Sequence, residues 1–121
     1  MSAKIIKTNP QAEYYFDEGC YILELSNSNQ DNAVSIARAR VLAGVTTQWH
    51  SLHNTIERYV ILSGSGLVEV GELTPQQVNA GDVVIIPAQC RQRISNTGNE
   101  DLIFLAICTP RFEVHHYQAL N

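Results

Sequence analysis

Short apolar segments separated by turn residues are the feature of this chain that most restricts its fold. Apolar runs of four to nine residues alternate along the sequence with clusters of Gly, Pro, Asn and Ser. The clearest runs span residues 21–25, 34–42, 58–62, 67–70, 83–86 and 102–108. Runs of this length that are rich in Val, Ile and Tyr are typical of β-strands, and several at short spacing indicate an all-β sandwich or barrel.

Helical signals are few. Residues 73–77 include Pro75 and are expected to form a loop, whereas residues 111–120 are expected to form a short helix or an extended arm. Runs 83–86 and 102–107 are apolar at every position, which indicates strands that are buried on both faces. The outer face of such strands in a small barrel often meets another subunit, so we expect a twofold homodimer.

Length and composition fit a single domain and exclude some partners. The chain has 121 residues, 45% of them hydrophobic, and a net charge of −4. Nucleic acids and anionic membranes attract concentrated Lys and Arg, so neither is expected as a partner. No apolar run approaches the roughly 20 residues that span a bilayer. Three cysteines without C-x-x-C spacing, and no apolar leader segment, make the cytoplasm the expected location.

Residues suited to metal chemistry gather in two segments. His50, His53 and Glu57 lie within eight residues of one another. Imidazole and carboxylate groups together suit a divalent ion such as Mn, Fe, Ni or Zn. A second polar segment begins after a buried run and includes Gln92 and Asn96.

These two segments resemble the two sequence motifs of the cupin family. The first motif, G-x5-H-x-H-x3,4-E-x6-G, is matched by Gly44, His50, Glu57 and Gly64. The second, G-x5-P-x-G-x2-H-x3-N, is matched by Gly81, Pro87 and Asn96. The resemblance implies a double-stranded β-helix, the cupin or jelly-roll barrel. It would form a single domain over residues 1–121, with its core at about 33–109 and a short C-terminal tail or helix.

The chain departs from the motifs at the positions that usually bind metal. Leu52 stands in place of the second motif histidine, and Gln92 in place of the third. Gln89 replaces the inner glycine of the second motif. His53 follows one residue late, and because side chains alternate along a strand it should point away from His50. A strand end or bulge just after His53 would still bring it to the site.

The resemblance therefore implies a divalent metal held by His50, Glu57 and Gln92, with His53 as a fourth ligand only if the strand ends there. The alternative is a metal-free pocket in which Glu57 hydrogen-bonds Gln92 and His50. In either case a buried Glu57 needs a compensating partner. Tyr59 shares the inward face with Glu57 by period two, so these two residues are the candidates for catalytic proton transfer.

Two functions remain open, because a fold does not determine an activity. In the first, the chain is a metal-binding cupin of undetermined activity that binds or transforms a small molecule as an oxygenase, isomerase or lyase. In the second, it is a metal-free small-molecule binding or sensing protein with a vestigial metal site. Cys20 and Cys108 carry no functional signal in the sequence. His115 and His116 are expected in a solvated tail, because adjacent side chains project differently and no third ligand is evident.

Overall fold

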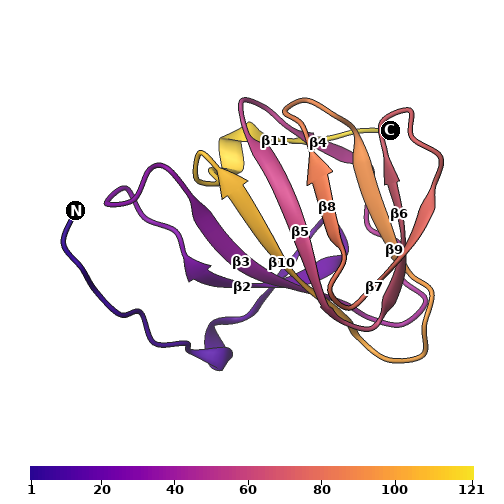
Figure 1. Cartoon of the computed structure of the whole chain (residues 1–121), viewed down its shortest axis with the longest axis horizontal. Coiled ribbons are helices and arrows are strands. Elements are labelled where there is room, and N and C mark those ends of the chain that lie inside the picture. Colours follow the sequence, from indigo (N-terminus) through magenta and orange to yellow (C-terminus); the bar gives the residue numbers. More distant parts are fainter.

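Two antiparallel sheets pack face to face around one apolar core (Figure 1). The computed structural model describes residues 1–121. The first sheet contains, in spatial order, β1 (Tyr14–Phe16), β2 (Cys20–Ser26), β3 (Ser35–Val41), β10 (Leu102–Thr109), β5 (Ile56–Ser63) and β8 (Val83–Ile86). The second contains β11 (Tyr117–Ala119), β4 (His50–Leu52), β9 (Gln92–Asn96), β6 (Ser65–Val70) and β7 (Gln76–Asn79).

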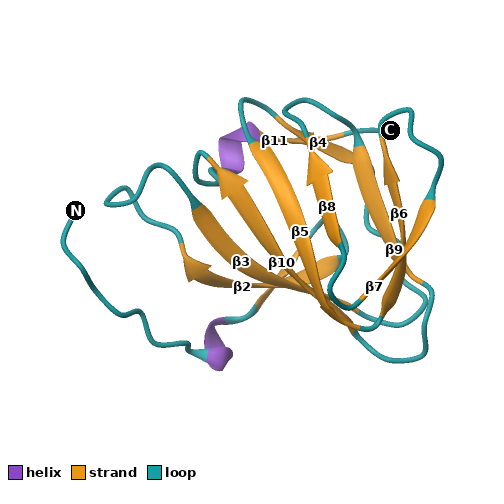
Figure 2. Ribbon diagram, viewed as in Figure 1, coloured by secondary structure: helices purple, strands orange, loops and turns teal.

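Helical structure is confined to two single 3-10 turns, η1 (Pro10–Ala12) and η2 (Val114–His116) (Figure 2). Neither is long enough or apolar enough to cross a bilayer. The prediction of an all-β double-stranded β-helix is confirmed by the two-sheet architecture.

The core follows from strand alternation. On β8, Val84 and Ile86 are buried, whereas Val83 and Ile85 face outward and are 57% and 63% exposed. Inward positions of the other strands supply the rest of the core, including Ile61, Ile94, Leu102 and Phe104. One face of each apolar run therefore fills the barrel, while the outer face of β8 stays open.

The motif glycines occupy turns that need a left-handed backbone. Gly44, Gly64 and Gly81 all have positive φ. At Gly64, between β5 and β6, a Cβ atom would lie 2.7 Å from the backbone oxygen of Asp101, so no other residue fits without displacing the backbone. Gln89 stands where the motif has glycine and keeps the same conformation, with φ of 65°.

The structure corrects one sequence expectation about these connecting segments and refines another. Residues 73–77 do not form a loop throughout, because β7 starts at Gln76 and pairs with β6 as an edge strand. Residues 111–120, expected to form a short helix or an extended arm, contain both. They contain η2 and then β11, whose Tyr117 pairs with Leu52 of β4. The C-terminal segment is thus part of the second sheet.

Candidate functional site

A pocket lies between the two sheets and is lined by side chains from both. Its polar lining includes Glu18, Glu24, Ser35, His50, Glu57, Tyr59 and Cys108. Aromatic rings from β1, β10 and the C-terminal segment also line it: Tyr14, Phe16, Phe104, Phe112 and Tyr117. The cavity volume is about 50 Å³. Since one water needs about 10–15 Å³, the pocket holds a few waters or the reacting part of a small organic ligand.

Glu57, Gln92 and Tyr59 form one buried hydrogen-bonded chain. Glu57 and Tyr59 lie two residues apart on β5 and both point inward, opposite Cys108 and Ala106 of β10. The Tyr59 hydroxyl donates to Oε1 of Gln92, and Nε2 of Gln92 donates to Oε1 of Glu57 at 2.9 Å. Gln92 is 1% exposed and lies behind the lining residues, so its amide braces the other two groups.

His50 enters the pocket from β4 with a defined tautomer. Its Nδ1 lies 2.8 Å from the backbone oxygen of Gln48. A carbonyl only accepts, so Nδ1 carries the proton and Nε2 of the neutral ring holds the lone pair. The ring is 2% exposed and stacks on Tyr117, with centroids 5.1 Å apart. Nε2 is therefore the basic atom of the pocket.

Glu18 is a second pocket carboxylate, and sequence reasoning missed it. It sits in the hairpin turn between β1 and β2, with Oε1 3.6 Å from Nε2 of His50. The Cys20 thiol donates to its Oε2 at 3.4 Å. The backbone oxygen of Glu18 accepts from the Gln48 N–H at 2.7 Å. One turn therefore fixes both Glu18 and the loop that orients His50.

Burial changes the acid–base properties of these groups. It raises the pKa of Glu18 to about 7. The pKa of Glu57 is also raised to about 7, first by burial and then by the nearby charge of Glu18. Burial lowers the pKa of His50 and raises that of Tyr59 well above its ordinary value. Near neutral pH the pocket therefore combines a neutral imidazole with two carboxyl groups that are readily protonated or ionised.

The structure brings together His50, Glu57, Gln92 and Tyr59 but not His53. Strand β4 ends at Leu52, and His53 is exposed in the turn that follows, where Asn54 has a φ of 56°. Its side chain is not part of the pocket lining.

The predicted ligand set fits a metal ion poorly in this arrangement. Oε1 of Gln92 already accepts from Tyr59, and both oxygens of Glu57 accept hydrogen bonds, from Gln92 and, at 3.9 Å, from the Cys108 thiol. Of the three predicted ligands, only His50 presents to the pocket an atom whose lone pair is not engaged in a hydrogen bond, its Nε2. A metal bound by all three would have to break the buried network first.

The structure adds two thiols that the sequence did not mark and corrects one sequence expectation. Cys108 lines the pocket beside Glu57 and Cys20 contacts Glu18, so both thiols belong to the site. His115 and His116 do have a third ligating group close by, the carboxylate of Glu113. The signal for this cluster was present as the spacing E-x-H-H, which a tight turn folds together.

Comparisons with known proteins agree with this fold. Residues 37–108 match the family model described as "Cupin domain". An uncharacterized protein of Methanocaldococcus jannaschii, MJ1618, is 33% identical over 116 residues, covering 93% of this chain and 92% of that protein.

Solved structures with the same barrel include the Streptomyces nucleoside dehydratase Pac13, with a TM-score of 0.79 at 14% identity, covering 98% of this chain and 92% of that chain. A predicted oxalate decarboxylase of Thermotoga maritima has a TM-score of 0.77 at 23% identity, covering 88% of this chain and 99% of that chain. At these identities the likeness concerns the fold alone. The family match extends over more than half of the residues and coincides with the two motifs and the barrel, so the chain belongs to the cupin family.

Proposed function

We propose that the chain binds a small hydroxylated organic molecule in the pocket and transfers protons within it without a metal ion. The observation that carries the proposal is the placement of a neutral imidazole opposite two carboxyl groups in one buried cavity. His50 acts as the base through Nε2, and Glu57 or Glu18 acts as the acid. This assigns the activity to the isomerase or lyase class.

The pKa directions support this division of roles. A general base must be unprotonated, and burial keeps His50 neutral by lowering its pKa. A general acid must hold a proton near neutral pH, and Glu18 and Glu57 do so because their pKa values are raised to about 7. Tyr59 and Gln92 position Glu57 through hydrogen bonds.

A structural neighbour supports the reaction class. The dehydratase Pac13 was solved with uridine in forms that carry a tyrosine-to-phenylalanine or a histidine-to-glutamine replacement. Dehydration removes a proton from one atom and protonates a leaving hydroxyl on another, which requires a base and an acid. The pocket of this chain offers both, together with aromatic rings that can pack against a ligand's flat face.

The test uses full-length, untagged protein treated with EDTA. It is incubated in D₂O with uridine and with a panel of small hydroxy-carbonyl compounds, and mass spectrometry detects loss of water or uptake of deuterium. We expect turnover of at least one compound without added metal. His50→Gln should abolish it, Glu57→Gln should reduce it at least about a hundredfold, and the exposed control His53→Ala should leave it unchanged.

A divalent ion, Mn, Fe, Ni or Zn, in the same pocket is the second candidate. Glu18 favours it, because this carboxylate sits 3.6 Å from Nε2 of His50 and adds a ligand that the motifs do not contain. Activity that EDTA removes and one of these ions restores would favour the metal-dependent function and contradict the metal-free one.

We further propose a twofold homodimer formed through the outer face of the first sheet, in a reducing, cytoplasmic setting. Val83 and Ile85 are exposed on β8, and their outward neighbours on β5 include Val60 and Arg58. Three unpaired thiols support the reducing setting. Light scattering should give twice the 13.5 kDa mass of one chain, and Val83→Glu with Ile85→Lys should give monomers.

A further inference from the structure

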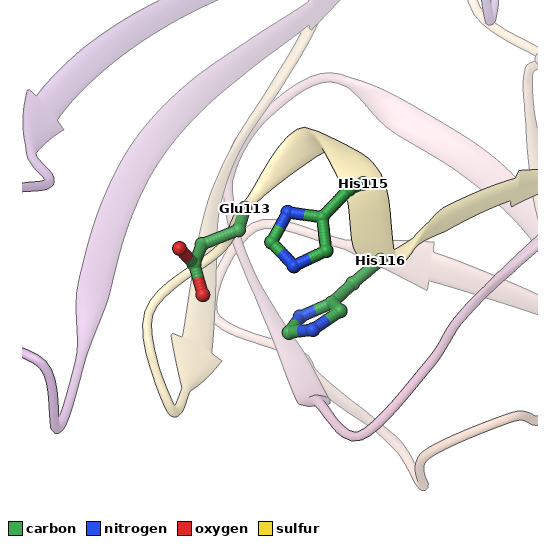
Figure 3. Close-up of side chains that lie close together, drawn as sticks. All are labelled: Glu113, His115 and His116. Atoms are coloured by element: carbon green, nitrogen blue, oxygen red, sulfur yellow. The ribbon is translucent and has the colours of Figure 1, made fainter.

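A second group of metal-ligating side chains lies outside the pocket, at the turn that precedes β11. Ligand atoms of Glu113, His115 and His116 all lie within 4.8 Å of one another. The two imidazole rings lie close together at an angle with the carboxylate beside them, and all three belong to one short turn (Figure 3). Their ring centroids are 4.2 Å apart.

The backbone that carries these residues is fixed at both ends. The backbone N–H of His116 donates to the backbone oxygen of Glu113 at 2.9 Å, which closes the turn. The His116 oxygen accepts from the His53 N–H at 2.8 Å, and Tyr117 pairs with Leu52 directly afterwards. The cluster is thus anchored to the second sheet, which reduces the entropy lost when its side chains bind an ion.

Two side-chain features point to a ligand at this turn. Nδ1 of His116 is buried without any hydrogen-bond partner, an arrangement that native proteins rarely leave uncompensated. Arg111 donates to Oε1 of Glu113 at 3.2 Å, which orients the carboxylate and leaves Oε2 without a partner. A third imidazole, that of His53, lies next to His116 with ring centroids 6.2 Å apart.

We propose that Glu113, His115 and His116 form a binding site for a divalent transition-metal ion of the Zn²⁺ type. Two imidazoles and one carboxylate are a ligand set found in three-ligand zinc sites, and the remaining position stays open for water. Bonds of about 2.0–2.1 Å place zinc ligands about 3.3 Å apart. The exposed His115 side chain can rotate to reach that spacing, because it is not packed in the core.

The test is zinc titration of EDTA-treated, untagged full-length protein by isothermal calorimetry, with ZnCl₂ as the probe. We expect wild type to bind zinc at this site, and His115→Ala and Glu113→Gln each to weaken that binding at least about tenfold. His50→Ala, which removes a pocket side chain and leaves Glu113, His115 and His116 in place, should keep the same affinity and stoichiometry at this site.

Melting temperatures of the metal-free proteins serve as the folding control. His115→Ala and Glu113→Gln alter side chains at the surface turn, so they should melt with wild type in EDTA and lose only the zinc-induced increase. The proposal is overturned if wild type binds no zinc, if His115→Ala binds with wild-type affinity, or if His50→Ala removes all zinc binding.

Discussion

The pocket and the C-terminal turn both contain imidazole and carboxylate groups, but they are built in opposite ways. In the pocket, Glu57 and Gln92 are buried and their polar atoms bond one another. At the turn, Glu113 and the two histidines lie near the surface, and Nδ1 of His116 has no partner. The Glu57–Gln92 pair satisfies its own donors and acceptors, whereas the turn leaves Nδ1 of His116 and Oε2 of Glu113 without partners.

This difference bears on how a cupin site is interpreted. The same residue types support acid–base chemistry when burial shifts their pKa values and a network holds them, and support ion binding when their lone pairs are free. Metal detected in this protein would therefore not by itself identify the pocket as the metal site. The variants below separate the two regions, from the largest expected effect to the smallest.

Removing the brace of the pocket network should have the largest effect on stability. Gln92→Leu leaves the Tyr59 hydroxyl and one Glu57 oxygen buried without partners. Each orphaned group costs about 1–3 kcal/mol, so we expect a loss of about 4 kcal/mol in the free energy of unfolding, measured by urea denaturation. A loss below 1 kcal/mol would mean that the network is not buried as described.

The pH dependence of stability should be dominated by the pocket carboxyls. The folded pKa values of Glu18 and Glu57 are about 7 against ordinary values of 4.5. The folded state holds more protons in this window, so the free energy of unfolding falls as pH rises from 4.5 to 7. His50 opposes the trend, because its lowered pKa removes stability as pH falls below about 6.5.

Glu18→Gln isolates one of these contributions. At pH 8 the variant should be more stable than wild type by up to about 3 kcal/mol, because it buries no charge at residue 18. At pH 4, where Glu18 is protonated in both the folded and unfolded states, the two proteins should unfold at similar urea concentrations. Parallel pH profiles for the two proteins would contradict the burial of an ionisable Glu18.

His53→Ala should have the smallest effect. The side chain is exposed and makes no hydrogen bond, and the backbone N–H that bonds the His116 oxygen remains in the variant. We expect a change within about 0.5 kcal/mol in urea denaturation. A loss of several kcal/mol would place His53 in the pocket network and remove the distinction between the two regions.

The fold was largely predictable because many of its strands coincide with apolar runs of the sequence. β3, β5, β8 and β10 coincide with apolar runs, and the motif glycines mark turns with positive φ. β7 was missed because its sequence is mostly polar, and β11 because it has only three residues. Pairing with a neighbour, rather than apolar composition, makes them strands, and that pairing is not visible in local sequence.

The site was predictable only where the motifs reach. His50, Glu57 and Gln92 fall in motif register, and Tyr59 follows from alternation on the same strand. Glu18 lies in a polar hairpin turn far from both motifs, so no spacing marks it as buried. The turn at residues 113–116 was misjudged because adjacent side chains diverge in an extended chain, whereas a 3-10 turn brings residues three apart, here Glu113 and His116, onto the same side.

The position of β10 between β3 and β5 also has a consequence for folding kinetics. β10 pairs with β3 across more than sixty residues of chain, and it places Cys108 opposite Glu57 on β5. Such distant pairings must close large loops before they gain stabilising contacts, so we expect this chain to fold on the slow, millisecond-to-second timescale of β-barrels. The pocket cannot be complete before β10 pairs, because this strand joins β3 to β5 and supplies Phe104, Ala106 and Cys108 to the lining.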